Sequence, residues 1–261
     1  MGLIAALPDI DLQPKAAFVM HEKFERLIPL HQHTKGQLTY IEGGIAYITI
    51  HFKTYIVPAH HFFWIPRGMP HLLRVSNSAT VVRNIYFYTY DDARDEFYSK
   101  LGIYPASRLL LEMIKYTERW DGRHVKSNNE NFEFLIALKN ILPEMGHKTL
   151  PIILPITEDE SMKRILRYME SRISSPLTLE QVSSQFNMST RSLSRFFQAR
   201  LQISFLQYLK TLRMVKAIEM LLKTQKPISE IALLVGYDSI GSFSNAFFAL
   251  TQSRPSDFRR A

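Results

Sequence analysis

The feature that most constrains this chain is a pattern written twice between residues 179 and 258. Several identical residues lie fifty positions apart: Ser189 and Ser239, Ser192 and Ser242, Phe197 and Phe247, and Gln202 and Gln252. An upstream apolar pair, Leu179 and Ile228, is forty-nine positions apart, so the second copy has one additional residue before its second half. A repeated supersecondary pattern determines the architecture of the segment that carries it. Each copy reads as a helix, a short polar turn and a second helix, which predicts two helix-turn-helix motifs.

The charge of the chain is concentrated in the same region. The formal net charge is +8, yet residues 161–261 hold 15 Lys and Arg against 6 Asp and Glu, whereas residues 1–160 hold 17 against 18. A basic domain joined to a neutral one is the electrostatic pattern of a nucleic-acid-binding protein. A solvated basic surface without a partner would show the same charge count, so the charge alone does not decide.

The first 90 residues show strand signals. Short runs rich in aromatic and β-branched residues recur at residues 17–20, 37–41, 46–50, 55–57, 62–65 and 81–90, and Gly and Pro residues separate them. Several short strands at close spacing predict a sandwich or a barrel.

Three histidines stand out in this predicted barrel. His31 and His33 alternate along a strand and therefore share a face, Gln37 follows, and His71 comes after a Pro-Arg-Gly turn. These positions resemble the two metal-binding motifs of cupins, H-x-H-x3-E and P-x-G-x2-H, with Gln37 in the place of the glutamate. A neutral amide is a poorer ligand for a divalent ion than a carboxylate, so we expect no metal or other cofactor. We instead expect the pocket to bind a small-molecule effector through His31, His33, Gln37, Tyr40, Trp64 and His71.

Helical periodicity replaces the strand signals further along. We expect helices near residues 106–119 and 129–142 with a polar loop between them, and their apolar faces suggest packing on the barrel or on a second copy in a homodimer. Residues 142–159 contain three prolines and read as an extended linker. We therefore predict an α+β chain with a cupin-like β-barrel and two packed helices in residues 1–144, a linker in 145–160, and an all-α domain of two helix-turn-helix motifs joined by a long helix in 161–261.

Helix caps and apolar positions organise the all-α domain. We expect a leading helix at residues 161–172, N-caps at Thr178 and Ser189, and a helix at residues 204–223 between the two motifs. The second helix of such a motif enters the major groove of DNA. Arginine pairs with guanine edges and serine positions phosphates, which points to the exposed polar residues of both second helices. The predicted DNA contacts are Arg191, Ser192, Ser194, Arg195, Gln198, Ser239, Ser242, Ser244 and Asn245.

The second motif also carries a family signature. The residues Ile228-Ser229-Glu230-Ile231-Ala232, Gly236-Tyr237, Ser242-Phe243-Ser244, Phe247, Pro255-Ser256 and Phe258-Arg259 resemble the AraC/XylS family of bacterial transcription regulators. The resemblance implies a cytoplasmic regulator that binds double-stranded promoter DNA and recruits or excludes RNA polymerase in response to a small molecule. It implies neither an enzymatic activity nor a catalytic residue.

The chain departs from that family in its two recognition helices. Relatives have glycine just after each helix, where this chain has Gln202 and Gln252, so either the left-handed backbone is strained or the turn is rebuilt. Asn245 also stands where arginine is common, and no basic residue lies between positions 239 and 248. We infer that the first motif does most of the base reading and that the second mainly grips phosphates.

Features that the sequence lacks limit the alternatives. The chain has no cysteine, no apolar run long enough for a membrane span and no basic region typical of a signal peptide, so we expect a cytoplasmic protein without a membrane partner. The competing interpretation is a metal-dependent cupin enzyme, or a metal sensor, fused to a DNA-binding domain, with His31, His33, Gln37 and His71 as ligands.

Overall fold

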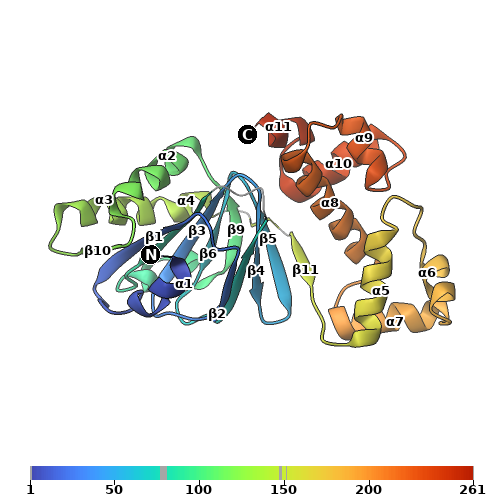
Figure 1. Ribbon diagram of the computed structural model, residues 1–261, viewed down its shortest axis with the longest axis horizontal. Coiled ribbons are helices and arrows are strands. Elements are labelled where there is room, and N and C mark those ends of the chain that lie inside the picture. Colours follow the sequence, from blue (N-terminus) through green and yellow to red (C-terminus); the bar gives the residue numbers. More distant parts are fainter. Residues whose placement is uncertain (1, 77–80, 147–148, 151, 261) are drawn as a thin grey trace. The chain divides into compact units, whose positions relative to one another are not determined.

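The computed structural model describes residues 2–76, 81–146, 149–150 and 152–260 and is shown in Figure 1. The chain divides into two compact units. Residues Met1–His51 and Tyr55–Pro151 form the N-terminal unit, and residues Phe52–Thr54 and Ile152–Ala261 form the C-terminal unit. The N-terminal unit is rich in strands and the C-terminal unit is helical, which confirms the predicted α+β class.

Two β-sheets form the framework of the N-terminal unit. The six-stranded sheet has the order β10 (Arg123–Lys126), β1 (Ala16–Glu22), β8 (Val81–Phe87), β3 (Gly36–Glu42), β6 (His61–Ile65) and β9 (Gly102–Pro105). The second sheet contains, in this order, β5 (Lys53–Pro58), β4 (Ile45–Ile50), β7 (His71–Val75) and β2 (Leu27–His31), and the short strand β11 (Ile153–Pro155) belongs to the C-terminal unit. The rings of Tyr55 on β5 and Phe63 on β6 lie 5.2 Å apart, so the two sheets pack against each other.

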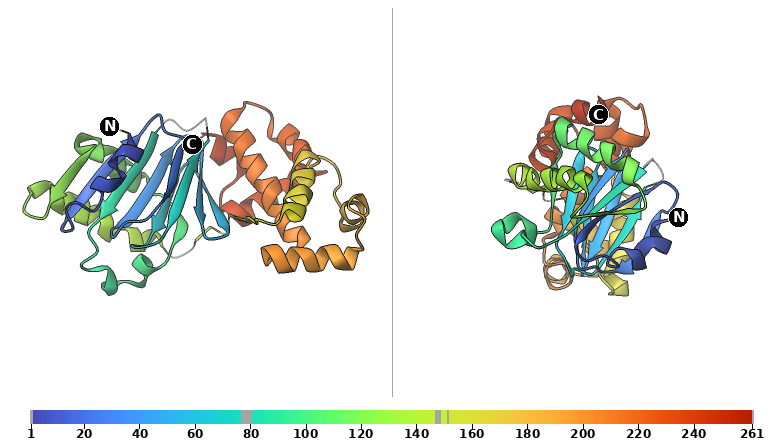
Figure 2. Two further views of the ribbon diagram at one scale, coloured as in Figure 1. Left: turned by 60° about the horizontal axis from the view of Figure 1, so that its bottom comes forward. Right: turned by 90° about the vertical axis from the view of Figure 1, so that its left-hand side faces the viewer.

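Helices cover the outer face of the six-stranded sheet, as Figures 1 and 2 show. Helices α2 (Arg108–Tyr116) and α3 (Glu130–Asn140) and the short α4 (Leu142–Met145) share an apolar core with this face. The core includes Leu38 and Trp64 from the sheet and Leu110 and Leu135 from the helices. Short helical segments complete the unit: α1 (Leu3–Ala6), η1 (Leu7–Asp9), η2 (Asp92–Arg94), η3 (Glu96–Ser99) and η4 (Thr117–Trp120).

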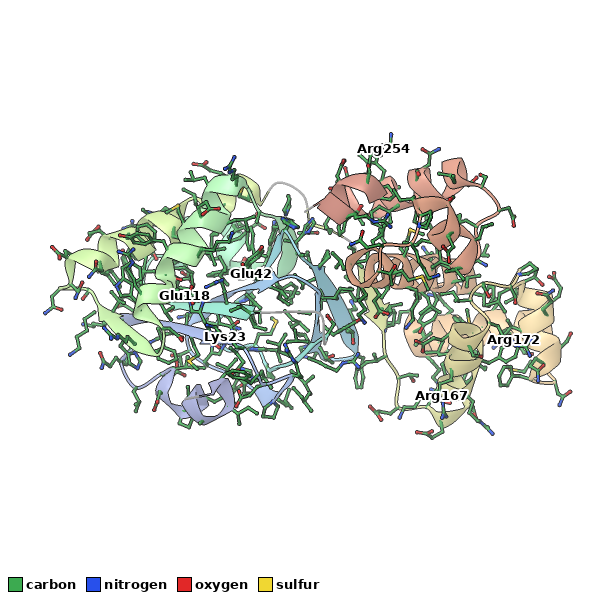
Figure 3. The ribbon with its side chains drawn as sticks, turned by 45° about the horizontal axis from the view of Figure 1, so that its top comes forward. Lys23, Glu42, Glu118, Arg167, Arg172 and Arg254 are labelled. Carbon is green, nitrogen blue, oxygen red and sulfur yellow. The ribbon has the colours of Figure 1, made fainter. Side chains whose placement is uncertain are left out.

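Buried ion pairs stabilise this unit. The Lys139 ammonium of α3 is fully buried and lies 2.6 Å from carboxylate oxygens of both Asp91 and Asp92. The Arg83 guanidinium of β8 lies 2.8 Å from Glu42 and 3.6 Å from Glu118, two acidic residues that lie near each other in Figure 3. Because an uncompensated buried charge is costly, each cation fixes the segment that carries its partners.

The structure corrects several expectations for this half of the chain. The strands β7, β9 and β10 were absent from the prediction, and β10 occupies the middle of the segment that was predicted as a polar loop. The strand predicted to carry both His31 and His33 is β2, which ends at His31 and does not include His33. The segment predicted as an extended linker begins with helix α4 and contains strand β11. These strands have only three to five residues, and cross-strand pairing rather than their own sequence determines their conformation.

Seven helices lie in the described part of the C-terminal unit, in which the long helix α8 joins two helix pairs (Figure 1). They are α5 (Glu160–Ser171), α6 (Leu179–Gln185), α7 (Thr190–Leu201), α8 (Phe205–Lys223), α9 (Ile228–Leu234), α10 (Ile240–Thr251) and α11 (Pro255–Arg260). The core of the first motif combines apolar residues from α5, α6, α7 and the start of α8, including Met162, Val182, Phe197 and Tyr208. None of the described helices combines the length and the apolar character needed to cross a bilayer.

The repeat in the sequence is a repeat in the structure. Helices α6 and α9 each have 7 residues, and helices α7 and α10 each have 12. Both turns close with the same backbone hydrogen bond, from Met188 to Ser183 and from Tyr237 to Ala232, each 2.9 Å long. The residues of these two bonds are forty-nine positions apart, whereas the capping residues Ser189 and Ser239 are fifty apart. The additional residue of the second motif is therefore Asp238, which lies between Tyr237 and Ser239.

Candidate functional site

The two second helices begin in the same way. Ser189 adopts an extended backbone and its Oγ accepts a hydrogen bond from the Ser192 amide at 3.1 Å, and Ser239 does the same for Ser242 at 3.2 Å. The hydroxyls of each pair are also within hydrogen-bond distance of each other, at 2.8 Å and 3.1 Å. The caps leave the first turn of each helix with amides and hydroxyls at an exposed end, where phosphates bind favourably.

Helix α7 presents a basic polar face to solvent. Leu193 and Phe197 are buried in the core, whereas Arg191, Ser192, Ser194, Arg195 and Gln198 are all exposed. Within the described part of the chain, neither Arg191 nor Arg195 takes part in an ion pair, whereas Arg200 at the end of the same helix lies 2.9 Å from Asp159. The two arginines of the exposed face are therefore available to an anionic partner.

Helix α10 has the same framework with a different exposed face. Phe243 and Phe247 take the buried positions of Leu193 and Phe197. Ser242 and Asn245 are exposed and Ser244 is half-buried, and no basic side chain lies on this helix. The helix can donate and accept hydrogen bonds, but its side chains add no positive charge.

The residues after both recognition helices retain the left-handed backbone. Gln202 has φ +58° and Gln252 has φ +57°, and their amides bond to Gln198 and Phe248, respectively. The turns are therefore not rebuilt, and each glutamine carries the cost of a conformation that glycine adopts freely.

A polar contact inside the C-terminal unit connects the two motifs. Arg213 on α8 donates to the Ser175 carbonyl oxygen at 3.2 Å, and its guanidinium lies 5.7 Å from the ring centroid of Tyr237. Gly236 has φ +85°, and a Cβ atom there would lie 2.4 Å from the Ile173 carbonyl oxygen. The segment before α6 and the turn before α10 thus contact each other beside α8, which restricts the relative movement of the motifs.

In the N-terminal unit the three predicted histidines come together. His31 ends β2 and pairs in register with His71 at the start of β7, and their ring centroids are 4.2 Å apart. The His33 ring lies 5.3 Å from that of His71, and Gln37 Oε1 lies 2.8 Å from His33 Nε2. His33, His71 and Gln37 are buried and His31 is half-buried.

Burial makes these imidazoles neutral. It lowers the pKa of His71 to about 3 and also lowers the pKa values of His31 and His33. One ring nitrogen from each histidine lies within 4.8 Å of one from each of the others. Neutral imidazoles with converging nitrogens can accept hydrogen bonds from a ligand or coordinate a metal ion.

Two residues predicted for the same pocket lie elsewhere. Tyr40 and Trp64 belong to the core between the six-stranded sheet and the helices, whereas Gln37 points to the other face of β3. Residues three apart on a strand have opposite orientations, so Gln37 and Tyr40 cannot share a face. Of the residues predicted for the pocket, only the histidines and Gln37 therefore remain candidates for contact with a small ligand.

The structure adds residues that the sequence did not indicate. The Gln37 amide donates to Thr39 at 2.8 Å and to Asn84 at 2.9 Å, so both residues orient it. Alternation along β3 could have identified Thr39. Asn84 is opposite Thr39 only through the β3–β8 register, which the sequence does not show.

Comparisons with known proteins match both halves. A family model described as an AraC-like ligand binding domain matches residues 21–91, and one described as a helix-turn-helix domain matches residues 182–261. The HTH-type transcriptional regulator NimR of Escherichia coli is 25% identical over 92% of this chain and 85% of its own length. The regulator GbdR of Pseudomonas aeruginosa is 27% identical over 64% of this chain and 44% of its own length.

Among solved structures, the C-terminal domain of the response regulator AraT from Geobacillus stearothermophilus is similar to the C-terminal unit. It is 42% identical, covers 39% of this chain and 85% of its own length, and has a TM-score of 0.38. With an AraC-like ligand-binding domain before a helix-turn-helix domain, and relatives named as transcriptional regulators, this chain belongs to the AraC family of DNA-binding transcriptional regulators.

Proposed function

We propose that the protein binds double-stranded promoter DNA in the cytoplasm through both helix-turn-helix motifs and that a small ligand at the histidine cluster controls this binding. The proposal keeps the division into a sensor domain in residues 1–144, a linker in 145–160 and a DNA-binding domain in 161–261. Its main support is the exposed face of α7, on which Arg191 and Arg195 form no ion pair with any residue that the structure describes. DNA-bound protein then recruits or excludes RNA polymerase.

Helix α7 is the helix that reads bases. Arg191 and Arg195 are four residues apart on one face, so both guanidiniums can reach the same stretch of the groove. A bidentate contact between arginine and guanine distinguishes base pairs by about 1–3 kcal/mol. Gln198 lies on the same exposed face, and Ser192 and Ser194 are suited to contacts with the phosphates on either side.

Helix α10 contributes mainly affinity. Its polar side chains can hydrogen-bond to phosphates but include no guanidinium group that could pair with a base edge. They are the exposed Ser242 and Asn245, the half-buried Ser244 and the cap residue Ser239. Two recognition helices on one face of DNA must be about 34 Å apart to enter successive turns of the major groove. The contact of Arg213 with Ser175 restricts this separation.

Substitution of Arg195 tests the assignment of base reading. We expect Arg195→Ala to weaken binding to a selected operator by about 1–3 kcal/mol and to relax the preference at one base position. Arg200→Ala is the matched control, because it removes the same charge from the same helix at a residue paired with Asp159. Binding curves on operator and unrelated duplexes at several salt concentrations separate the two effects.

The outcomes are distinct. Arg191→Ala should resemble Arg195→Ala at a neighbouring base, whereas Asn245→Ala should weaken binding by a similar factor on all sequences. If Arg195→Ala lowers the affinity equally for every duplex, the Arg195 guanidinium contacts a phosphate and does not recognise a base. A clear change of base preference in Asn245→Ala would reverse the assigned roles of the two helices.

We also propose that a second copy of the chain packs on α2. Leu109 and Tyr116 at the two ends of this helix are 63% and 45% exposed, although Leu110 and Ile114 are fully buried beneath them. Leu109→Asp should then shift a dimer towards monomer in sedimentation at micromolar concentration. A wild-type chain that sediments as a monomer under these conditions would refute this part of the proposal.

A further inference from the structure

The hydrogen bonds of the three clustered histidines show which ring nitrogens are free. Nδ1 of His31 lies 2.8 Å from the Pro29 carbonyl oxygen, Nδ1 of His33 lies 2.7 Å from that of Lys35, and Nδ1 of His71 lies 2.9 Å from that of Met69. A carbonyl oxygen can only accept, so each Nδ1 carries the hydrogen. Each neutral ring therefore has its lone pair on Nε2.

These lone pairs are poorly satisfied by the protein itself. Within the described part of the chain, Nε2 of His31 and Nε2 of His71 are buried and have no hydrogen-bond partner. A buried polar atom without a partner is destabilising, so two such atoms in one cluster favour the binding of a partner there.

The contact between His33 and Gln37 is compatible with a bound cation. Its Nε2 lies 2.8 Å from Gln37 Oε1, and both atoms are acceptors when the ring is neutral. The Gln37 amide nitrogen is turned to Thr39 and Asn84. Reversing the Gln37 amide would pair it with the His33 ring only if the Asn84 amide, whose Nδ2 has no partner within the described part of the chain, is reversed as well. A cation between the imidazole and the amide oxygen would be attracted to both atoms.

We propose that His31, His33 and His71 bind one divalent transition-metal ion through Nε2, with Gln37 Oε1 as a fourth ligand. Histidines that bind metal commonly donate the other ring N–H to a carbonyl oxygen, as all three do here. Imidazole ligands favour nickel, copper and zinc over magnesium and calcium. Tetrahedral ligands at about 2.0–2.1 Å from the metal are about 3.3 Å apart, so nitrogens that are up to 4.8 Å apart must approach by roughly 1.5 Å on binding. The half-buried His31, at the end of a strand, has the most freedom to move.

Gln37 makes this a reversible site. Three imidazoles and an amide are all neutral, so the bound ion keeps its full charge of +2, which a glutamate would reduce. Binding is therefore weaker than with a carboxylate and responds to the concentration of the free ion. The inference deepens the proposed function, because it names the class of ligand at the histidine cluster as a transition-metal ion.

Titration of the metal-free full chain with Ni²⁺ and Zn²⁺ in the absence of DNA tests the site. Calorimetry should show one ion per chain, and the copper-loaded chain should show nitrogen hyperfine splitting in its electron paramagnetic resonance spectrum. His31→Ala should weaken binding at least tenfold, and Gln37→Glu, which restores a carboxylate, should strengthen it at least tenfold. His51→Asn is the matched control, because it removes an exposed histidine and asparagine tolerates its left-handed backbone.

Absence of saturable binding, or equal binding by wild type and His31→Ala, would overturn the inference, as would weaker binding by Gln37→Glu. Operator binding by the metal-free and nickel-loaded chains is then compared. A change of at least threefold is expected, and equal affinity of the two forms would refute the ion as the regulatory ligand. A chain that binds metal but no DNA would instead contradict the proposed function and leave the metal site intact.

Discussion

Replacing Gln202 with glycine should stabilise the C-terminal unit. Gln202 ends α7 with φ +58°, a conformation that costs an L-residue about 1–2 kcal/mol relative to the right-handed region. Glycine avoids this cost but loses about 0.5–1 kcal/mol more backbone entropy on folding. The expected net effect of Gln202→Gly is a gain of about 0.5–1 kcal/mol in the free energy of unfolding.

The second copy of the repeat provides an internal comparison. Gln252 has almost the same backbone conformation, but its side-chain amide also lies 3.4 Å and 3.3 Å from the carbonyl oxygens of Phe248 and Ala249. Glycine would remove these two long hydrogen bonds to the end of α10. Gln252→Gly should therefore gain less than Gln202→Gly, and we expect a change near zero.

Urea unfolding of the full chain, followed by circular dichroism at 222 nm, measures this effect. Tryptophan fluorescence is unsuitable, because Trp64 and Trp120 both lie in the N-terminal unit. Ala199→Gly is the control, since it adds a glycine to the exposed interior of the same helix and should destabilise by about 1 kcal/mol. If Gln202→Gly lowers the free energy of unfolding while the slope of this free energy against urea concentration is unchanged, the strain argument is refuted.

Three further predictions concern stability. Gly236→Ala should destabilise the C-terminal unit by about 2–4 kcal/mol in urea unfolding, because the new Cβ meets the Ile173 carbonyl oxygen and keeps a left-handed backbone. Gly241→Ala is the control, since its Cβ meets open space; equal effects of the two substitutions would contradict this reasoning. Lys139→Met should cost about 3–5 kcal/mol because the buried Asp91 and the half-buried Asp92 lose their cation, and unchanged unfolding by urea would show that the two carboxylates do not depend on it. Burial lowers the pKa of His61 to about 4, so the unfolded chain binds more protons here and stability should fall as the pH falls from about 6.5 to 4; His61→Gln should make that fall shallower, and an identical pH profile would oppose it.

The architecture of the C-terminal unit was largely predictable because local signals agree with the fold. Capping serines at Ser189 and Ser239 mark the helix starts, and the apolar positions of α7 and α10 have helical spacing. The contact between Gly236 and Ile173 was not predictable, since it joins residues 63 positions apart in the sequence. The sequence shows that Gln202 and Gln252 replace the family's glycines, but only the structure shows that both residues keep the left-handed backbone.

The histidine cluster was predicted in part. Its three imidazoles come from two segments that the strand register of His31 and His71 brings together. The alternation of side chains along β3 places Gln37 and Tyr40 on opposite faces, and this separation follows from the sequence spacing alone. Trp64 is opposite Leu38 in the register, so its position depends on strand pairing and could not be read locally.

Selection of bound duplexes from a random-sequence library by the full chain tests the central claim most directly. If both motifs bind successive turns of the major groove, the enriched sequences should contain two blocks with centres about 10 base pairs apart. The block contacted by α7 should be the more strongly specified, and Arg195→Ala should remove the preference at one of its positions. Enrichment of no sequence, or of a single block that Arg195→Ala leaves unchanged, would contradict the account.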